Sequence, residues 1–152
     1  MNAIIDKTTY NIDKVFFGEP IKNTIIENSI FRRIIYTEQH ISFNNITLSF
    51  NLRNVYIKKY YNKWKCMIND QIFVDYITNF ERNILKKLNI TNKKSCNAIT
   101  QQVENGYVKL FSDIANQKSY DTYIIILKVS GVWESVSEYG LTYKVCDTKT
   151  IL

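Results

Sequence analysis

Turn-forming residues are scarce in this chain, which has only 4 glycines and 1 proline among 152 residues. Its turns must therefore rely on Asn, Asp and Ser. The sequence contains no CxxC spacing, and its three cysteines, Cys66, Cys96 and Cys146, stand far apart. Such scattered cysteines argue against both a disulfide framework and a zinc site. We expect all three to be reduced, small apolar residues that hold no metal.

Catalytic signatures are also missing. His40 is the only histidine, and the sequence has no P-loop, GxSxG or HExxH motif. The carboxylate pairs Asp70/Asp75 and Glu134/Glu138 have spacings typical of solvated residues. We therefore predict that the protein is not an enzyme and uses no cofactor.

Neither a signal peptide nor a membrane span is recognisable. The opening residues, MNAIIDKTTY, lack a basic region followed by a long apolar one. The longest apolar run, Tyr123 to Leu127, has the length of a strand rather than of a membrane helix. We expect a protein that is not secreted and has no membrane partner.

Apolar and basic residues, in contrast, are plentiful. Hydrophobic residues make up 45% and charged residues 22%, which is enough for a single packed domain over residues 1–152. The net charge of +6 favours an anionic partner such as nucleic acid, although solubility alone would explain it. Asn, Ile, Lys and Tyr have codons rich in A and T, so a biased genome accounts for part of the lysine and tyrosine content.

Alternating apolar residues predict strands along most of the chain. The predicted strands are Phe31 to Tyr36, His40 to Phe50, Arg53 to Tyr60, Trp64 to Ile68, Gly106 to Phe111, Thr122 to Trp133 and Tyr139 to Cys146. The alternation changes parity across Asn44-Asn45, which predicts a bulge or a short hairpin there. Residues 1–30 are predicted to be an irregular, peripheral segment, and residues 89–105 a loop with at most a short strand.

One helix is predicted between the strands. Apolar residues recur there at spacings of four and three, at Phe73, Ile77, Phe80, Ile84 and Leu88. Asp70 is suited to cap the start of a helix over Gln71 to Leu88, and Lys86-Lys87 suit its C-terminal end. The predicted fold is mainly β with one central amphipathic helix (α+β). A helix between the third and fourth strands of a small antiparallel barrel is the OB-like arrangement.

The stretch LKVSGVWESVSEYGLTYKV, from Leu127 to Val145, resembles the end of small proteins of unassigned role in nucleocytoplasmic large DNA viruses. The resemblance extends upstream to about Phe31. It implies a viral origin and a location in a viral factory in the host cytoplasm or nucleus. Such viruses also encode OB-fold single-stranded-DNA-binding proteins, which implies a role in viral DNA replication or repair. Many of those proteins end in an acidic tail, and the final CDTKTIL of this chain does not match it.

The segment YIKKYYNKWK, Tyr56 to Lys65, combines four lysines with four aromatic rings. Lysines pair with phosphates, and aromatic rings stack on bases. Alternatively, the rings pack across the hairpin or into a core while the lysines protect a sheet edge. The predicted nucleic-acid-binding residues are Arg53, Lys58, Lys59, Tyr60, Tyr61, Lys63, Trp64 and Lys65, together with Arg32 and Arg33.

Three hypotheses remain open at this point, one of which is a degenerate enzyme fold. The first is a non-catalytic protein that binds single-stranded DNA or RNA. The alternative is a structural or assembly protein of a virion or viral factory, acting through contacts with itself or with other viral proteins. Trp133 and Tyr139, on either side of the last crossover, are either core anchors or a stacking site.

Overall fold

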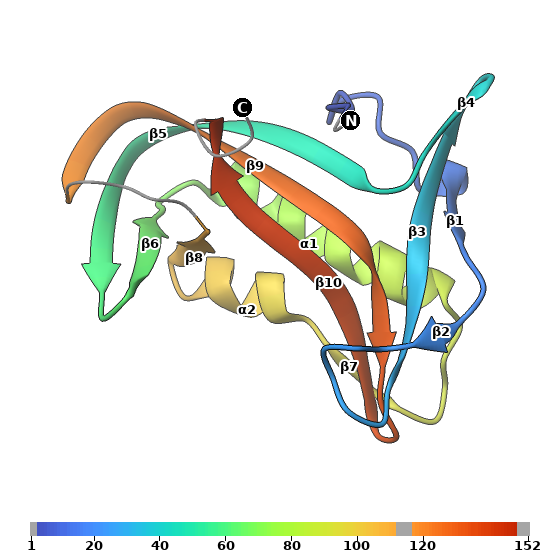
Figure 1. The fold of residues 1–152 in the computed structure, drawn as a ribbon. Helices are drawn as coiled ribbons and strands as arrows, with labels where there is room; N and C mark the ends of the chain where they lie inside the picture. Colours follow the sequence, from blue (N-terminus) through green and yellow to red (C-terminus); the bar gives the residue numbers. More distant parts are fainter. Residues whose placement is uncertain (1–2, 112–116, 149–152) are drawn as a thin grey trace.

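The computed structural model describes residues 3–111 and 117–148, and it shows a long, bent sheet beside two helices (Figure 1). The strands are β1 (Val15–Phe17), β2 (Ile21–Lys22), β3 (Ile30–Glu38), β4 (Ile41–Phe43), β5 (Ile46–Tyr60), β6 (Lys63–Met67), β7 (Lys94–Cys96), β8 (Tyr107–Leu110), β9 (Lys118–Glu134) and β10 (Glu138–Asp147). The helices are α1 (Gln71–Lys87) and α2 (Ala98–Glu104), with a short 3-10 turn at Ile12–Lys14. The β7–β10 pair is parallel and the other strand pairs are antiparallel. The fold is therefore α+β with a mainly antiparallel sheet, as predicted.

β9 forms the centre of the sheet because it has partners along both edges. On one edge, residues 118–129 pair with β5 and residues 131–134 pair with β3. On the other edge, residues 125–134 pair with β10. Ile125, Ile126 and Leu127 are all buried, as expected for a strand covered on both faces.

The sheet continues from β5 through β6 to β8 and remains open beyond it. The free edge of β8 faces the free edge of β10, and we call the gap between these two edges the seam. A backbone hydrogen bond crosses the seam at one end, from Phe111 N–H to the Val145 carbonyl at 2.7 Å. Because the sheet is open, the OB-like barrel predicted from the strand order is not confirmed.

Helix α1 forms where the sequence predicts it. The Asp70 side chain caps it by accepting a hydrogen bond from the Phe73 N–H at 3.1 Å. Phe73 meets Phe50 of β5 edge-on, with ring centroids 4.9 Å apart. The predicted apolar stripe is buried against the sheet at Phe73, Ile77, Phe80 and Ile84. Neither α1 nor any other helix in the described ranges has the length and apolar character needed to cross a membrane.

The described part of the N-terminal segment predicted to be peripheral, residues 3–30, contributes to the core. Ile5 and Val15 both belong to the buried core. The Ile5 N–H donates to the Thr47 carbonyl at 2.8 Å, and β1 pairs with β3. The segment therefore covers apolar surface of the sheet, because two of its apolar side chains reach the core although its sequence shows no regular alternation.

The hairpin expected at Asn44-Asn45 does not form. β4 pairs instead with β3, across a turn at Gln39 and His40, and β5 pairs with β9. Gln39 has φ +51°, the left-handed conformation that closes this tight turn. The two predicted strands are therefore divided differently, because the second half of His40 to Phe50 and all of Arg53 to Tyr60 belong to the single long strand β5.

Helix α2 lies within the segment 89–105 that was predicted to be a loop. It has only 7 residues, too few to show a sustained helical period. Ile99 and Val103, one turn apart, are buried in the core. The short strand allowed for in this segment is β7, which pairs with β10.

Candidate nucleic-acid interface

The long strand β5 is bent (Figure 1), and its backbone departs from the extended conformation at Asn54. Asn54 has φ +54°, a conformation that asparagine tolerates better than most residues. Leu52 and Val55 are both buried, so the alternation of buried and exposed residues shifts here. Beyond the bend, Val55 and Ile57 point inward, whereas the alternate residues Tyr56 and Lys58 point outward, as the sequence predicted for this stretch.

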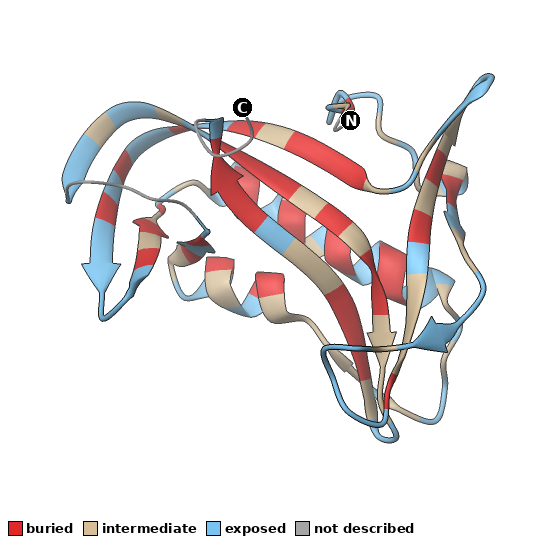
Figure 2. Cartoon of the chain, in the orientation of Figure 1, coloured by how far each residue is buried: buried red, intermediate tan, exposed pale blue. Residues whose placement is uncertain are grey.

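Strand register then assembles a single exposed surface from β5, β6 and β8. Lys58 lies opposite Lys65, which lies opposite Lys109. Residues directly opposite each other project on the same face of a sheet. On this surface, the residues that we call the lysine–tyrosine face are Tyr56, Lys58, Tyr60, Lys63, Lys65, Tyr107 and Lys109, and the half-buried Met67 lies between Tyr56 and Tyr107. Figure 2 shows the tip of the β5–β6 hairpin exposed.

The rings on this face are held by lysine and by one another. The Lys65 Nζ lies 4.4 Å from the ring centre of Tyr60 and 4.3 Å from that of Tyr107. Such cation–ring contacts orient the rings without burying them. Tyr61, in the hairpin turn with φ +56°, meets Tyr60 edge-on at 4.7 Å. Tyr60 remains 48% exposed and Tyr61 82% exposed.

These three strands carry an excess of positive charge equal to the net charge of the whole chain. β5, β6 and β8 contain six Lys and Arg residues and no Asp or Glu. The whole chain has 20 basic and 14 acidic residues, so the rest of it contains 14 of each sign. The net charge of +6 is thus located in one part of the sheet, where it produces a locally positive potential.

Two residues of the predicted site lie on the opposite side of the hairpin. Lys59 and Trp64 are directly opposite each other, in the inward-facing row that includes Ile57 and Cys66. Trp64 is only 9% exposed, and the Lys59 Nζ lies 5.7 Å from its ring centre. The structure therefore corrects the assignment of Trp64 to the stacking surface, because its ring packs in the core. Arg53 is exposed on β5, before the bend.

Arg32 and Arg33 do not join the lysine–tyrosine face. They lie on β3, and from Lys118 to Gly131, opposite Arg33, β9 runs for roughly 40 Å at about 3.3 Å per residue. Arg32 also lies 3.9 Å from Glu134, which Lys93 contacts at 2.5 Å. Arg32 and Arg33 therefore lie far from the hairpin, and Arg32 and Lys93 both contact the Glu134 carboxylate.

Sequence reasoning missed the contribution of β8. Tyr107 and Lys109 complete the lysine–tyrosine face, although they are about forty residues beyond the hairpin in the chain. The alternation YVKLF, from Tyr107 to Phe111, repeats the hairpin pattern of outward Tyr and Lys with inward apolar residues. That repeated pattern was the available signal, but pairing between β6 and β8 could not be inferred from it.

A groove of ≈ 690 Å³ follows the seam between β8 and β10. Lys63, Lys109 and Lys144 lie along it. Phe111 is 64% exposed there, and the Lys144 Nζ lies 3.9 Å from its ring centre. The groove thus begins where the lysine–tyrosine face ends, since Lys63 and Lys109 belong to both.

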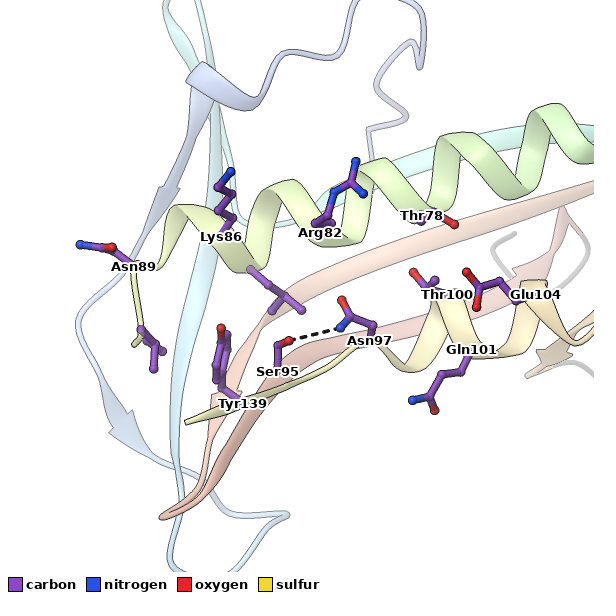
Figure 3. Close-up of a pocket in the computed structure, with 12 residues that line it drawn as sticks. Thr78, Arg82, Lys86, Asn89, Ser95, Asn97, Thr100, Gln101, Glu104 and Tyr139 are labelled. Atoms are coloured by element: carbon purple, nitrogen blue, oxygen red, sulfur yellow. Dashed lines mark hydrogen bonds between the residues drawn. The ribbon is translucent and has the colours of Figure 1, made fainter. Parts of the chain in front are cut away.

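A second hollow, of ≈ 600 Å³, lies between α1 and α2 (Figure 3). Arg82 and Lys86 extend from α1 on the side away from α2, whereas Asn97 and Thr100 project toward α1. The Asn97 amide donates to the Ser95 hydroxyl at 3.3 Å. This hollow is therefore lined mainly by uncharged polar groups and does not concentrate charge.

The buried carboxylate of Glu81 has a structural role beside this hollow. It accepts hydrogen bonds from the Ile99 N–H at 3.2 Å and from the Thr100 N–H at 2.8 Å, at the start of α2. The Thr100 hydroxyl also donates to it at 2.7 Å. Burial raises the pKa of the Glu81 carboxyl, and these hydrogen bonds oppose that rise. Glu81 thus caps α2 from a neighbouring helix, which fixes α2 against α1.

The remaining reactive side chains are dispersed. His40 is exposed in the β3–β4 turn, and among residues 3–111 and 117–148 no three His, Cys, Asp or Glu side chains are grouped to hold a metal ion. Cys66, Cys96 and Cys146 form no disulfide with one another. Burial raises the pKa of the Cys66 thiol to about 12, which keeps it protonated at neutral pH.

Comparison of this chain with protein-family models, curated proteins and solved structures finds no match. The interface must therefore be interpreted from its own geometry and charge.

Proposed function

We propose that this protein is a non-catalytic binder of single-stranded nucleic acid, DNA or RNA, without strong sequence preference. The lysine–tyrosine face and Tyr61 are the binding surface. The observation that carries the proposal is that the strands holding the entire net charge also present the exposed tyrosines. Lysines at strand spacing pair with successive phosphates, and tyrosine faces stack on bases.

The exposed rings favour a single strand over a duplex. Stacking on a protein ring requires an unpaired base, whereas a duplex offers mainly phosphates to a basic sheet. Tyr60 and Tyr61 form the projecting tip of the hairpin and have no core to pack into. In this proposal the protein is similar to OB-fold proteins in how it binds, since a curved sheet with a basic aromatic face serves as the binding platform.

The biological setting is a further part of the proposal. The resemblance of Leu127 to Val145 to viral proteins supports a role in viral DNA replication or repair, inside a viral factory in the host cytoplasm or nucleus. The lysines of the lysine–tyrosine face lie on β5, β6 and β8, so the proposed phosphate contacts come from strands that the structure describes.

Fluorescence anisotropy with a labelled oligonucleotide tests this function. A single strand of about 20 nucleotides should bind at low salt, and log K should fall with log salt by about 0.7 for each phosphate neutralised. A duplex of equal length should bind more weakly per phosphate because it offers no unpaired base. Absence of binding at tens of micromolar protein, or an affinity that salt does not change, would refute the proposal.

An assembly role remains the second candidate, favoured by a separate apolar surface. Ile21 and Ile25 are exposed beside a hollow of ≈ 460 Å³, and Ile25 is 86% exposed. Trp133 and Leu141 line the same hollow. Exposed isoleucines of this kind mark protein contacts more often than nucleic-acid contacts. Self-association that persists at high salt and disappears in Ile25→Lys, measured by sedimentation, would favour this second function.

A further inference from the structure

A side chain bridges the seam between β8 and β10, in addition to the backbone hydrogen bond from Phe111 to Val145. Gln102, on α2, accepts a hydrogen bond from the Lys109 N–H at 2.9 Å through its Oε1. Its Nε2 donates to the Tyr143 hydroxyl at 2.6 Å. The amide therefore bridges the edge of β8 to β10 and forms part of the lining of the groove.

The groove has rings on its walls and lysines at its edge. Trp64, Phe111 and Tyr143 all line it. Among the described residues that line it, none is acidic, whereas three are lysines. Because Trp64 is nearly buried, its remaining exposure is toward this groove rather than toward the lysine–tyrosine face. An occupant should therefore combine a flat apolar body with negative charge.

The groove is also continuous with the proposed binding surface. Lys63 and Lys109 stand at the edge where the lysine–tyrosine face meets the groove. A strand that lies across the face and passes over β8 can keep its phosphates near these lysines and near Lys144. Its next base then lies above the groove, beside the ring of Phe111.

We propose that the groove at the seam receives one unpaired nucleobase of the bound strand. The inference rests on the proposed function and adds to it a defined base-binding site. The base stacks on Phe111 while Lys63, Lys109 and Lys144 neutralise the phosphates on either side of it. A base inside a duplex cannot enter, so this site would contribute to discrimination against double-stranded nucleic acid.

The test combines affinity with a signal from the groove itself. Trp64 and Trp133 are the two tryptophans, so Trp133→Phe leaves Trp64 as the sole reporter. Titration with a short oligothymidylate should quench the emission of Trp64, and a duplex should not. Phe111→Ala should weaken binding of the single strand about tenfold, as loss of one stacked base predicts.

A matched control exists elsewhere on the sheet. Phe16 is also exposed beneath a lysine, with the Lys87 Nζ 5.3 Å from its ring centre, but it lies on β1. Phe16→Ala should bind the oligonucleotide like wild type. If anisotropy shows binding while Trp64 emission is unchanged and Phe111→Ala matches Phe16→Ala, the groove site is wrong and the proposed function stands. If no oligonucleotide binds at low salt, the proposed function fails and the groove site fails with it.

Discussion

Basic residues lie near both ends of strand β9, but the groups that they contact differ between the two ends. At the hairpin end, the lysines of β5, β6 and β8 have no Asp or Glu on their own strands and contact tyrosine rings. At the other end, Arg32 and Lys93 both face Glu134. A basic residue therefore indicates a partner only when the fold leaves its charge uncompensated, which sequence spacing does not reveal.

The largest expected effect concerns stability at the β3 end. A Cβ on Gly131 would lie 2.4 Å from the Arg32 carbonyl oxygen and 2.3 Å from the Phe31 ring. Gly131→Ala should therefore lower the free energy of unfolding by roughly 3 kcal/mol. Urea denaturation measures this change. At Gly18 a Cβ meets atoms at 3.6 Å, so Gly18→Ala should be tolerated, and equal stability of the two variants would contradict the close packing of β3 on β9.

The second prediction removes the uncompensated charge. Replacing Lys58, Lys63 and Lys65 by Ala should reduce affinity for a single strand by roughly two orders of magnitude at about 50 mM salt, and should reduce the salt slope by about 2. The matched triple variant, with Ala at Lys22, Arg33 and Lys94, removes the same charge from exposed residues elsewhere. Anisotropy titrations of both variants decide the comparison. Equal losses of affinity in the two variants would show that binding depends on the net charge of the protein and not on where that charge lies.

The third prediction tests stacking separately from charge. Tyr61→Ala should weaken binding by about 1–3 kcal/mol, since its exposed ring stacks on one base. The slope of log K against log salt should stay the same, because the ring releases no counterions. Titration at several salt concentrations provides both values. A change in slope without a change in affinity at low salt would argue against stacking.

The smallest effect is expected from removing a negative charge at the end of β9 that pairs with β3. Glu134→Gln removes the carboxylate that Arg32 and Lys93 share. We expect a loss of stability of about 1 kcal/mol or less, typical of partly exposed ion pairs. Nucleic-acid affinity should rise about twofold to threefold at low salt through the added net charge. An affinity equal to that of wild type would mean that charge at the β3 end of β9 does not influence binding at the hairpin end.

The helix and most strands could be predicted because their signals are local. Phe73, Ile77, Phe80 and Ile84 repeat over several turns, and only burial against a sheet explains that repeat. The alternation of Val55 and Ile57 with lysine and tyrosine likewise determines the two faces of the hairpin. Helix α2 escaped prediction because its 7 residues hold a single pair of core side chains one turn apart.

The parts of the site that could not be predicted depend on distant segments. Trp64 and Tyr60 are both aromatic residues of the hairpin, and the sequence alone does not show which ring is buried. That depends on the packing of core residues on one side of β6. Tyr107 joins the lysine–tyrosine face because β6 pairs with β8, although α1, β7 and α2 separate these two strands in the sequence. The charge of Arg32 is compensated by Glu134, which lies about a hundred residues later in the chain. Such contacts leave no local pattern to detect.

The position of β9 in the chain has a consequence for folding during synthesis. β5, β3 and β10 all pair with this one strand, which begins only at Lys118. A nascent chain that has produced β3, β5 and α1 therefore lacks the strand that joins them. Contacts so distant in sequence form slowly, and unpaired strand edges are prone to associate with other chains until they do. We expect ribosome-bound chains that end before β9 to expose the apolar residues of β5 and to be preferred clients of chaperones.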